Sequence, residues 1–430
     1  MRERVDVVVI GGGIVGAAAA YFLAKRGVSV TLVEKGRVAF EQSSRNWGWV
    51  RQNGRNLREV PAAIVSRRIW AGLRGEIGTD VGWVSAGNVD LAYSAEEMRT
   101  FEAWRRGAAE LGLDTEVLSR EAVRDRLPWL KDGYVGGIFS PLDGQADPHR
   151  AAPALARAAQ EQGAEVVTDC IVEALDVDDG AVRGVRTERG TIAAGRVIVA
   201  AGAWSSRLLW PLGLRLPQRK VRATVLATTP APALSPVVVW TDDVAMRQGP
   251  DGRFILAGGG RSHYDVDLEL ARFAPRFARS LFDARRRGRI RLHLGRTALR
   301  DLRTLLPEPV GEPLWPQVRA EEPEPDVDAA WRTFRRFREL VPQAADVGVD
   351  RIWAGYIDYT PDAVPIIDAP GTPRGLVIAT GFSGHGFALG PVGGLLASQL
   401  ATDEPTAVDV RSFRLSRFDE GDTAEDVLHF

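Results

Sequence analysis

The fold is decided by one stretch near the start of the chain, Val5-Asp6-Val7-Val8-Val9-Ile10-Gly11-Gly12-Gly13-Ile14-Val15-Gly16. Its first half is apolar and rich in β-branched residues, which predicts a buried strand. A helical pattern follows over 17–26, Gly27 ends it, and a second apolar run over 28–33 leads into Glu34-Lys35. Two strands joined by a helix in so short a span predict a βαβ unit with parallel strands.

The glycines of this stretch have the spacing G-x-G-x-x-G. Gly11 suits the tight turn after the strand, Gly13 lets the backbone approach a pyrophosphate, and Gly16 lets helix and strand pack closely. The helix N-terminus offers unpaired N–H groups to phosphates, and Glu34 lies where a carboxylate can accept ribose hydroxyls. We therefore expect a dinucleotide site. Its predicted residues in this unit are Gly11, Gly13, Ile14, Val15, Gly16, Glu34 and Lys35.

Composition excludes several classes of protein. The 430 residues are 45% hydrophobic and 26% charged with a net charge of −1, which argues against nucleic acid as an obligate partner. A single cysteine, Cys170, excludes a disulfide framework, and the five histidines show no metal-ligand spacing. The chain starts almost directly on its first strand, and no run of about 18 apolar residues occurs. We expect a cytoplasmic, soluble enzyme without a signal peptide or membrane anchor.

The fold class expected is α/β, with a Rossmann-like, mostly parallel sheet interleaved with an antiparallel α+β domain. We assign residues 1–82, 145–215 and 355–430 to the first, cofactor-binding domain. Residues 83–144 and 216–354 form the second, substrate-binding domain, with an Arg-rich and mainly helical insertion at about 264–305. The polar, Gly-punctuated residues 41–56 are typical of a loop that faces a ligand.

Two later stretches favour FAD over NAD. The apolar strand 196–200 ends in small residues that let a cofactor lie flat against the backbone. Residues 375–387 predict a strand, a Gly-rich turn and a second helix N-terminus, which suits the negative charge of a reduced flavin. A nicotinamide enzyme has no evident need for this second anion site. The cofactor contacts expected here are Ala201, Gly202, Trp204, Gly381, Ser383, Gly384, His385 and Gly386.

From residue 5 to about 418 the chain resembles the D-amino-acid oxidase, glycine oxidase and sarcosine oxidase superfamily of FAD-dependent oxidoreductases. Besides the βαβ unit, the matching motifs are Glu41-Gln42-Ser43-Ser44, Ala200 to Ser205, Thr360 to Ile367 and Gly381 to Phe387. Within the superfamily it is most similar to the bacterial L-amino-acid deaminase branch, which shares residues 41–45, the Met246-Arg247 strand and the helical insertion. That branch also carries an N-terminal membrane anchor, which we do not expect in this protein.

The resemblance implies roles for matching positions. Ser43 and Ser44, followed by Arg45, are similar to the residues that hold the pyrophosphate, and Val172 lies where a strand meets the adenine. Arg247 matches an arginine that clamps the substrate carboxylate, Trp353 matches an aromatic wall, and Tyr356 is expected beside it. Trp49, in the loop near Ser43, is a candidate to stack on flavin or substrate, as is Trp47.

Departures from the family pattern narrow these roles. Ala388 and the stretch Gly355-Tyr356-Ile357-Asp358 stand where relatives carry the lysine or arginine of a carboxylate clamp. Arg247 or Arg51 must then bind the carboxylate, or the substrate has none; Asp358 reads as a turn residue. The histidine and cysteine that link flavin covalently in some relatives are also missing. Arg45 stands in the loop of residues 41–56, and Cys170 lies in another region. We expect non-covalent FAD.

The function that the resemblance implies is oxidation of the C–N bond of an amino acid or amine. Hydride would pass to flavin N5, and the imine would hydrolyse; no catalytic base is assigned. The alternatives are a secondary-amine (sarcosine-like) oxidase or dehydrogenase, a flavin-dependent hydroxy-acid dehydrogenase on the same scaffold, and a NAD enzyme. The electron acceptor is oxygen, or a quinone or electron-transfer partner.

The segment 272–303 holds eleven arginines against two aspartates. A solvated helical face explains such a run, and so does contact with an acidic surface. We expect that it can dock the enzyme on an acidic membrane or on an acceptor protein, which would make the protein cytoplasmic or peripheral to the inner membrane face.

Overall fold

The computed structural model describes residues 1–258, 262–265, 272–277, 290–293 and 319–424. The opening stretch forms the centre of a sheet that has eight strands within these residues, in the order β10-β11-β12-β1-β2-β9, with β21 beside β12 and β20 beside β21. Four strand pairs of this sheet are parallel: β1 with β12, β1 with β2, β2 with β9, and β12 with β21. The strands are β1 (Arg4–Ile10), β2 (Val30–Val33), β9 (Glu165–Val167), β10 (Val172–Asp178), β11 (Ala181–Thr187), β12 (Gly190–Val199), β20 (Ile366–Asp368) and β21 (Leu376–Thr380).

Small residues pack the helices of this domain closely. In α1 (Ile14–Lys25) four consecutive alanines, 17–20, are fully buried, and α11 (Gly386–Ala401) lies against it. A Cβ added to Gly394 of α11 would lie 2.5 Å from the Ala18 Cβ, so glycine sets this helix spacing. The other helices of this domain are α2 (Gln42–Arg45), α3 (Val60–Ile77), α6 (Pro148–Glu161), α7 (Ser205–Leu209) and α12 (Arg417–Glu420).

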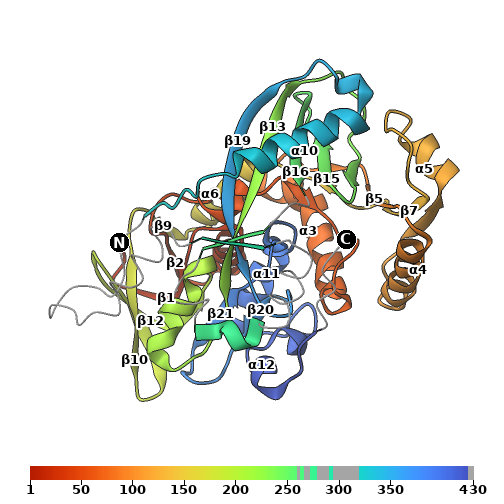
Figure 1. Cartoon of the computed structure of the whole chain (residues 1–430). Helices are drawn as coiled ribbons and strands as arrows, with labels where there is room; N and C mark the ends of the chain where they lie inside the picture. Colours follow the sequence, from red (N-terminus) through yellow and green to blue (C-terminus); the bar gives the residue numbers. More distant parts are fainter. Residues whose placement is uncertain (259–261, 266–271, 278–289, 294–318, 425–430) are drawn as a thin grey trace.

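The second sheet has ten strands within the described residues, in the order β18-β17-β13-β16-β15-β14-β5-β7-β6, with β19 beside β13. Most neighbours are antiparallel, and β13 and β19 extend from this sheet toward the first domain, while α10 lies across it (Figure 1). Its strands are β5 (Asn88–Ala92), β6 (Glu116–Ser119), β7 (Gly136–Ser140), β13 (Arg219–Pro230), β14 (Val238–Trp240), β15 (Val244–Gln248), β16 (Arg253–Gly258), β17 (Ser262–Asp265), β18 (Ile290–His293) and β19 (Val349–Tyr359). Its helices are α4 (Ala95–Glu110), α5 (Arg120–Arg126) and α10 (Val327–Leu340).

A small third sheet joins the two domains. It consists of β3 (Trp49–Val50), β4 (Val84–Ser85) and β8 (Gly144–Gln145), with β8 in the middle. Asp143, just before β8, accepts hydrogen bonds from the backbone N–H groups of Gln52 (2.8 Å) and Asn53 (3.1 Å). These contacts fix the loop of residues 41–56 at the domain boundary.

The predicted fold class is confirmed, since a mostly parallel sheet and an antiparallel sheet alternate along the chain. The domain boundaries stay a prediction; β19 runs through residue 355, where we placed one of them. The expectation that 264–305 is mainly helical is wrong at 264–265, which end strand β17, and at Ile290–His293, which form strand β18 and pair with β17. The helix expected there is present at 272–277, and most of the rest of the insertion lies outside the described residues. No described helix has the length and apolar character needed to cross a membrane.

Candidate active site

The turn between β1 and α1 forms a cradle that only glycine permits. Gly11 has φ +104°, and a Cβ there would lie 2.4 Å from the Ala200 carbonyl oxygen. Gly13 caps α1 in extended conformation, and the Ile14 N–H donates to Ser43 Oγ at 2.9 Å. The N–H groups of the first helical turn have no partner within the helix. This arrangement suits the pyrophosphate of a dinucleotide.

Glu34 closes the far side of this cradle. Its carboxylate accepts hydrogen bonds from the N–H groups of Gly12 (2.7 Å) and Gly36 (2.8 Å), and burial raises its pKa. Lys35, next in the chain, pairs with Glu41, and its ammonium lies 4.2 Å from the centre of the Trp204 ring. The predicted acid and its neighbour therefore both line the cavity next to the glycine turn.

A second turn, between β21 and α11, reaches the same cavity. Ser383 and Gly384 both have positive φ, 50° and 87°, and His385 precedes the first residue of α11. Asp358 of β19 holds this turn, because its carboxylate accepts a hydrogen bond from the Gly381 N–H at 2.8 Å. Burial raises the pKa of Asp358 to about 6. The interpretation of Asp358 as a turn residue is wrong: it is a buried strand residue.

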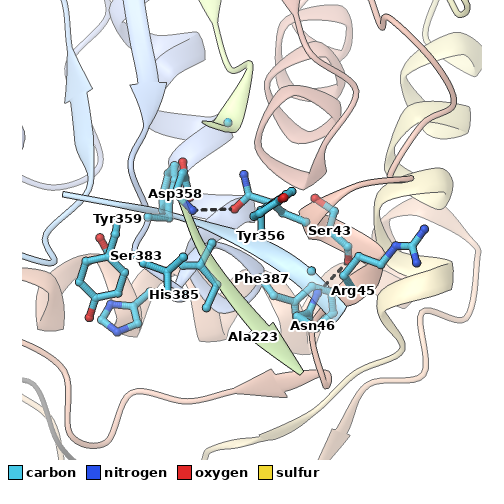
Figure 2. A pocket seen from close by; sticks show the side chains of 18 of the residues that line it. Ser43, Arg45, Asn46, Ala223, Tyr356, Asp358, Tyr359, Ser383, His385 and Phe387 are labelled. Atoms are coloured by element: carbon cyan, nitrogen blue, oxygen red, sulfur yellow. Dashed lines mark hydrogen bonds between the residues drawn. The ribbon is translucent and has the colours of Figure 1, made fainter. Parts of the chain in front are cut away.

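One cavity of about 1880 Å³ joins both helix N-termini with the antiparallel sheet. Single small-molecule sites span roughly 300–1,000 Å³, so it has room for a dinucleotide and a substrate. Figure 2 shows Ser43, Arg45 and Asn46 at one part of its wall, and Tyr359, Ser383 and His385 at another. The predicted residues that line it are Gly11, Gly13, Ile14, Val15, Glu34, Lys35, Ser43, Arg45, Trp49, Arg51, Val172, Ala201, Gly202, Trp204, Tyr356, Ser383, Gly384, His385 and Gly386.

Three predicted cofactor residues do not line the cavity and support its walls instead. A Cβ on Gly16 would lie 1.9 Å from the Gly11 carbonyl oxygen, and a Cβ on Gly381 would lie 2.5 Å from Thr360 Cγ2. The Ser44 hydroxyl donates to the Phe40 carbonyl at 3.0 Å. They shape the turns that carry the lining residues.

Two predicted substrate residues make hydrogen bonds to the loop of residues 41–56 instead. The Arg247 guanidinium donates to the Trp47 carbonyl and, at 2.7 Å, to Gln145 Oε1, so it holds the 41–56 loop. Burial lowers its pKa to about 10. The Trp353 indole N–H donates to the Arg45 carbonyl at 2.9 Å. Neither residue is among those that line the cavity.

Arg51 and Arg55 line the cavity with unused hydrogen-bonding capacity. Within the described residues the Arg51 guanidinium makes no hydrogen bond; its nearest carboxylate oxygen, on Asp90, is 3.9 Å away, and it stacks 4.1 Å from the Trp49 ring centre. In the described part of the chain Arg55 donates only from Nε, to the Arg51 carbonyl at 3.3 Å, and its buried Nη1 has no partner there. Burial lowers the pKa of both, for Arg55 to about 9. Buried guanidinium N–H groups without hydrogen-bond partners favour an anionic ligand.

Residues that sequence reasoning missed complete the wall. Trp240, at the end of β14, stacks on Trp49 with ring centres 5.4 Å apart, and Tyr359 ends β19 beside the cavity. Glu59 is fully buried and lies 3.0 Å from the His385 ring. Arg55 and Glu59 follow Arg51 at spacings of four, a repeat that predicts one helical face and could have drawn attention to them.

The fold and this cavity define the class of protein. The chain matches the FAD dependent oxidoreductase (DAO) family over residues 6–400, and it belongs to that family. The resemblance seen in the sequence is confirmed. Among relatives, the sarcosine oxidase subunit beta of Arthrobacter sp is 29% identical over 98% of this chain and 92% of its own. The glycine oxidase of Geobacillus kaustophilus is 27% identical over 97% of this chain and 98% of its own.

Solved structures agree with this assignment. The L-amino acid deaminase from Proteus myxofaciens, solved in complex with anthranilate, superposes with a TM-score of 0.89 at 26% identity, over 97% of this chain and 94% of that one. L-proline dehydrogenase from P.horikoshii superposes with a TM-score of 0.81 at 24% identity, over 98% and 99%. The glycine cradle, the Glu34 carboxylate and the second helix N-terminus fit the FAD that the family requires.

Proposed function

We propose that the protein is an FAD-dependent amino-acid or amine oxidase or dehydrogenase that oxidises a C–N bond. One observation carries the proposal: a single cavity joins the two helix N-termini to Arg51 and Arg55, whose Nη1 groups have no hydrogen-bond partner among the described residues. The helix ends suit a dinucleotide, and the arginines suit a carboxylate. The relatives named above, with their glycine, sarcosine and L-amino-acid substrates, support this substrate class.

The residues of the first turn would hold the pyrophosphate, Glu34 the ribose, and the turn 381–386 the flavin ring. When bound, FAD would accept a hydride from the carbon that bears the amine. The chain would orient the substrate. Arg51 and Arg55 would bind its carboxylate, and Trp49 and Tyr356 would form the walls around its side chain. The position of Arg247 makes it the weaker candidate for the carboxylate.

We propose that FAD is bound without a covalent link. Arg45 occupies the early loop, with its guanidinium held by Glu322, and Cys170 lies beside Glu34 at the ribose end. Acid precipitation of the yellow holoenzyme should release all of the flavin into the supernatant. Flavin that stays with the pellet would contradict this.

The test of the function is a panel of amino acids, secondary amines such as sarcosine, and hydroxy acids, read by flavin bleaching without oxygen. Bleaching by an amino acid with release of ammonia supports the proposal. Bleaching by hydroxy acids alone would contradict it and favour the hydroxy-acid alternative. We propose that the electron acceptor is either oxygen or a quinone or electron-transfer partner. Readmission of oxygen or addition of a quinone to the bleached enzyme distinguishes these.

We also propose that segment 272–303 docks on an acidic surface, a membrane or an electron-acceptor protein; most of the segment lies outside the described residues. Within the described part, Phe273 and Phe277 are buried, and Arg272 stacks on Trp210 at 4.1 Å. Exposed basic residues contribute roughly 1 kcal/mol each near an anionic bilayer. Vesicle co-sedimentation at low salt should show more protein on anionic than on neutral vesicles; equal binding contradicts a membrane role.

A further inference from the structure

Glu59 and His385 form a buried pair in the cavity wall. His385 Nδ1 lies 3.0 Å from Glu59 Oε1. The Glu59 side chain is 0% exposed and that of His385 is 16% exposed, and both residues line the cavity. Glu59 ends the short helix η1 (Leu57–Glu59), and His385 stands at the start of α11, so the pair also joins the two segments that frame the cavity.

The charge on Glu59 decides which nitrogen of His385 carries a proton. The charges of Arg51 and Arg55 interact favourably with the Glu59 carboxyl group. A carboxylate can only accept a hydrogen bond, so Nδ1 must carry the proton. Burial, followed by the charge of Arg55, lowers the pKa of His385 to about 4. At neutral pH the ring is therefore uncharged, and Nε2 presents a lone pair.

That lone pair is open to the cavity. Within the described residues Nε2 has no hydrogen-bond partner, and it is not among the side-chain atoms sealed from solvent. Figure 2 shows the ring beside Tyr359, at the part of the wall that also holds Ser383. An acceptor nitrogen suits a ligand with an N–H group and does not suit the negative edge of a reduced flavin.

We propose that His385 Nε2 accepts a hydrogen bond from the substrate amine, and that Glu59 is a positioning residue that fixes the required tautomer. This rests on the proposed function, which supplies an amine as the ligand. The backbone N–H groups of the turn then serve the cofactor, and the imidazole serves the substrate. Arg51 and Arg55 bind the carboxylate. Hydrogen-bond donors thus recognise the carboxylate of an amino acid, and a hydrogen-bond acceptor recognises its amine.

The tautomer can be measured directly on the resting holoenzyme. Imidazole ¹⁵N shifts at pH 7 should show the proton on Nδ1 of His385, assigned by loss of its signals in His385→Gln. In Glu59→Gln the amide can also donate to Nδ1, so part of the population should move its proton to Nε2. Glu76→Gln, the same change on α3 outside the cavity, should leave the spectrum unchanged. A wild-type ring protonated on Nε2, or on both nitrogens, would overturn the proposal.

The amine contact is tested with two probes, 2-aminobenzoate and benzoate, whose binding is followed by the change in flavin absorbance. A neutral hydrogen bond should make wild type prefer 2-aminobenzoate by about 2- to 10-fold. Glu59→Gln should reduce the preference and Glu76→Gln should keep it; the ratio cancels any change in carboxylate affinity. Equal affinity in the wild type overturns the proposal. If the enzyme turns over no amine, the proposed function is contradicted. The tautomer measurement and the probe-binding ratio do not depend on turnover.

Discussion

At the scale of single residues, Arg51 offers the cavity a guanidinium without a hydrogen-bond partner among the described residues. We predict that Arg51→Met lowers kcat/KM for an amino-acid substrate by about 100-fold, because losing a charge-assisted contact costs about 3 kcal/mol. The corresponding decarboxylated amine should lose little, since it has no carboxylate to bind. Steady-state kinetics on the two substrates measures the difference.

Arg247→Met is the matched control. Arg247 holds the Trp47 carbonyl and Gln145, so its loss should lower stability and affect both substrates alike. If Arg247→Met discriminates between acid and amine and Arg51→Met does not, the carboxylate site has been assigned to the wrong arginine.

A pH dependence follows from Asp358, whose pKa is raised from 3.8 to about 6 by burial. The folded state binds this proton more tightly than the unfolded state, so its contribution to stability is fully present below pH 3.8 and is lost as the pH rises through 6. The shift corresponds to about 3 kcal/mol. Relative to Asp358→Asn, the wild-type free energy of unfolding should fall by about that amount between pH 4 and 6.

Urea unfolding of both holoenzymes across this range measures the difference, and subtracting the variant cancels other titrating groups such as Asp143. A wild-type curve parallel to that of Asp358→Asn would show that the carboxylate is charged throughout and that its hydrogen bonds from Gly381, Thr380 and Gln218 outweigh burial.

The sequence predicted residues whose role follows from a local pattern, and it failed where the role depends on a distant partner. Gly11 and Glu34 were found because turn geometry and strand ends are local. Arg247 matched a family position, but its guanidinium is taken up by Trp47, 200 residues away. Glu59 was missed because only the fold brings it to His385, 326 residues away.

At the scale of elements, the spacing of α1 and α11 places both helix N-termini at one cavity. A Cβ at Gly394 would lie 2.5 Å from the Ala19 nitrogen and 2.6 Å from the Val15 carbonyl oxygen. We predict that Gly394→Ala destabilises the protein by about 1–3 kcal/mol and weakens FAD binding, because overpacking forces the helices apart. Thermal unfolding and flavin fluorescence titration measure the two effects.

Gly72→Ala is the control, since Gly72 lies within α3 and a Cβ there meets nothing within 4 Å. It should stabilise by about 0.5–1 kcal/mol through helix propensity and leave FAD affinity unchanged. An equal response of the two variants would mean that the α1–α11 contact does not set the cofactor site.

Elements with a clear period were predictable and the Arg-rich insertion was not. The sequence predicted a helix over 17–26, ended by Gly27, and α1 (Ile14–Lys25) occupies that stretch. Residues 290–293 lie in the insertion that we expected to be mainly helical, although Ile290 and Leu292 alternate with polar residues. Pairing with β17, a tertiary contact, decided the outcome.

At the scale of the whole molecule, the cavity is lined by both sheets, and β13 and β19 span the distance between them (Figure 1). We propose that its two halves bind different groups. The α1 turn and Glu34 suit an adenosine diphosphate unit, whereas the α11 turn, Arg51 and Trp49 would contact the flavin and the substrate. A ligand that reaches only the first half leaves the contact between the domains unsupported.

We therefore predict that FAD stabilises the apoprotein more than ADP does, even when each is present at the same multiple of its own Kd. Simple mass action gives the same gain for both, about 2.7 kcal/mol at 100 times Kd, if unfolding is one cooperative event. If the antiparallel domain can unfold separately in the apoprotein, ADP will protect only the parallel domain, and thermal scans will show two transitions that FAD merges into one. Hydrogen exchange should then show β13 and β19 protected by FAD and not by ADP. A single transition with ADP would establish that the two sheets unfold together without the flavin, and that the cofactor does not join them.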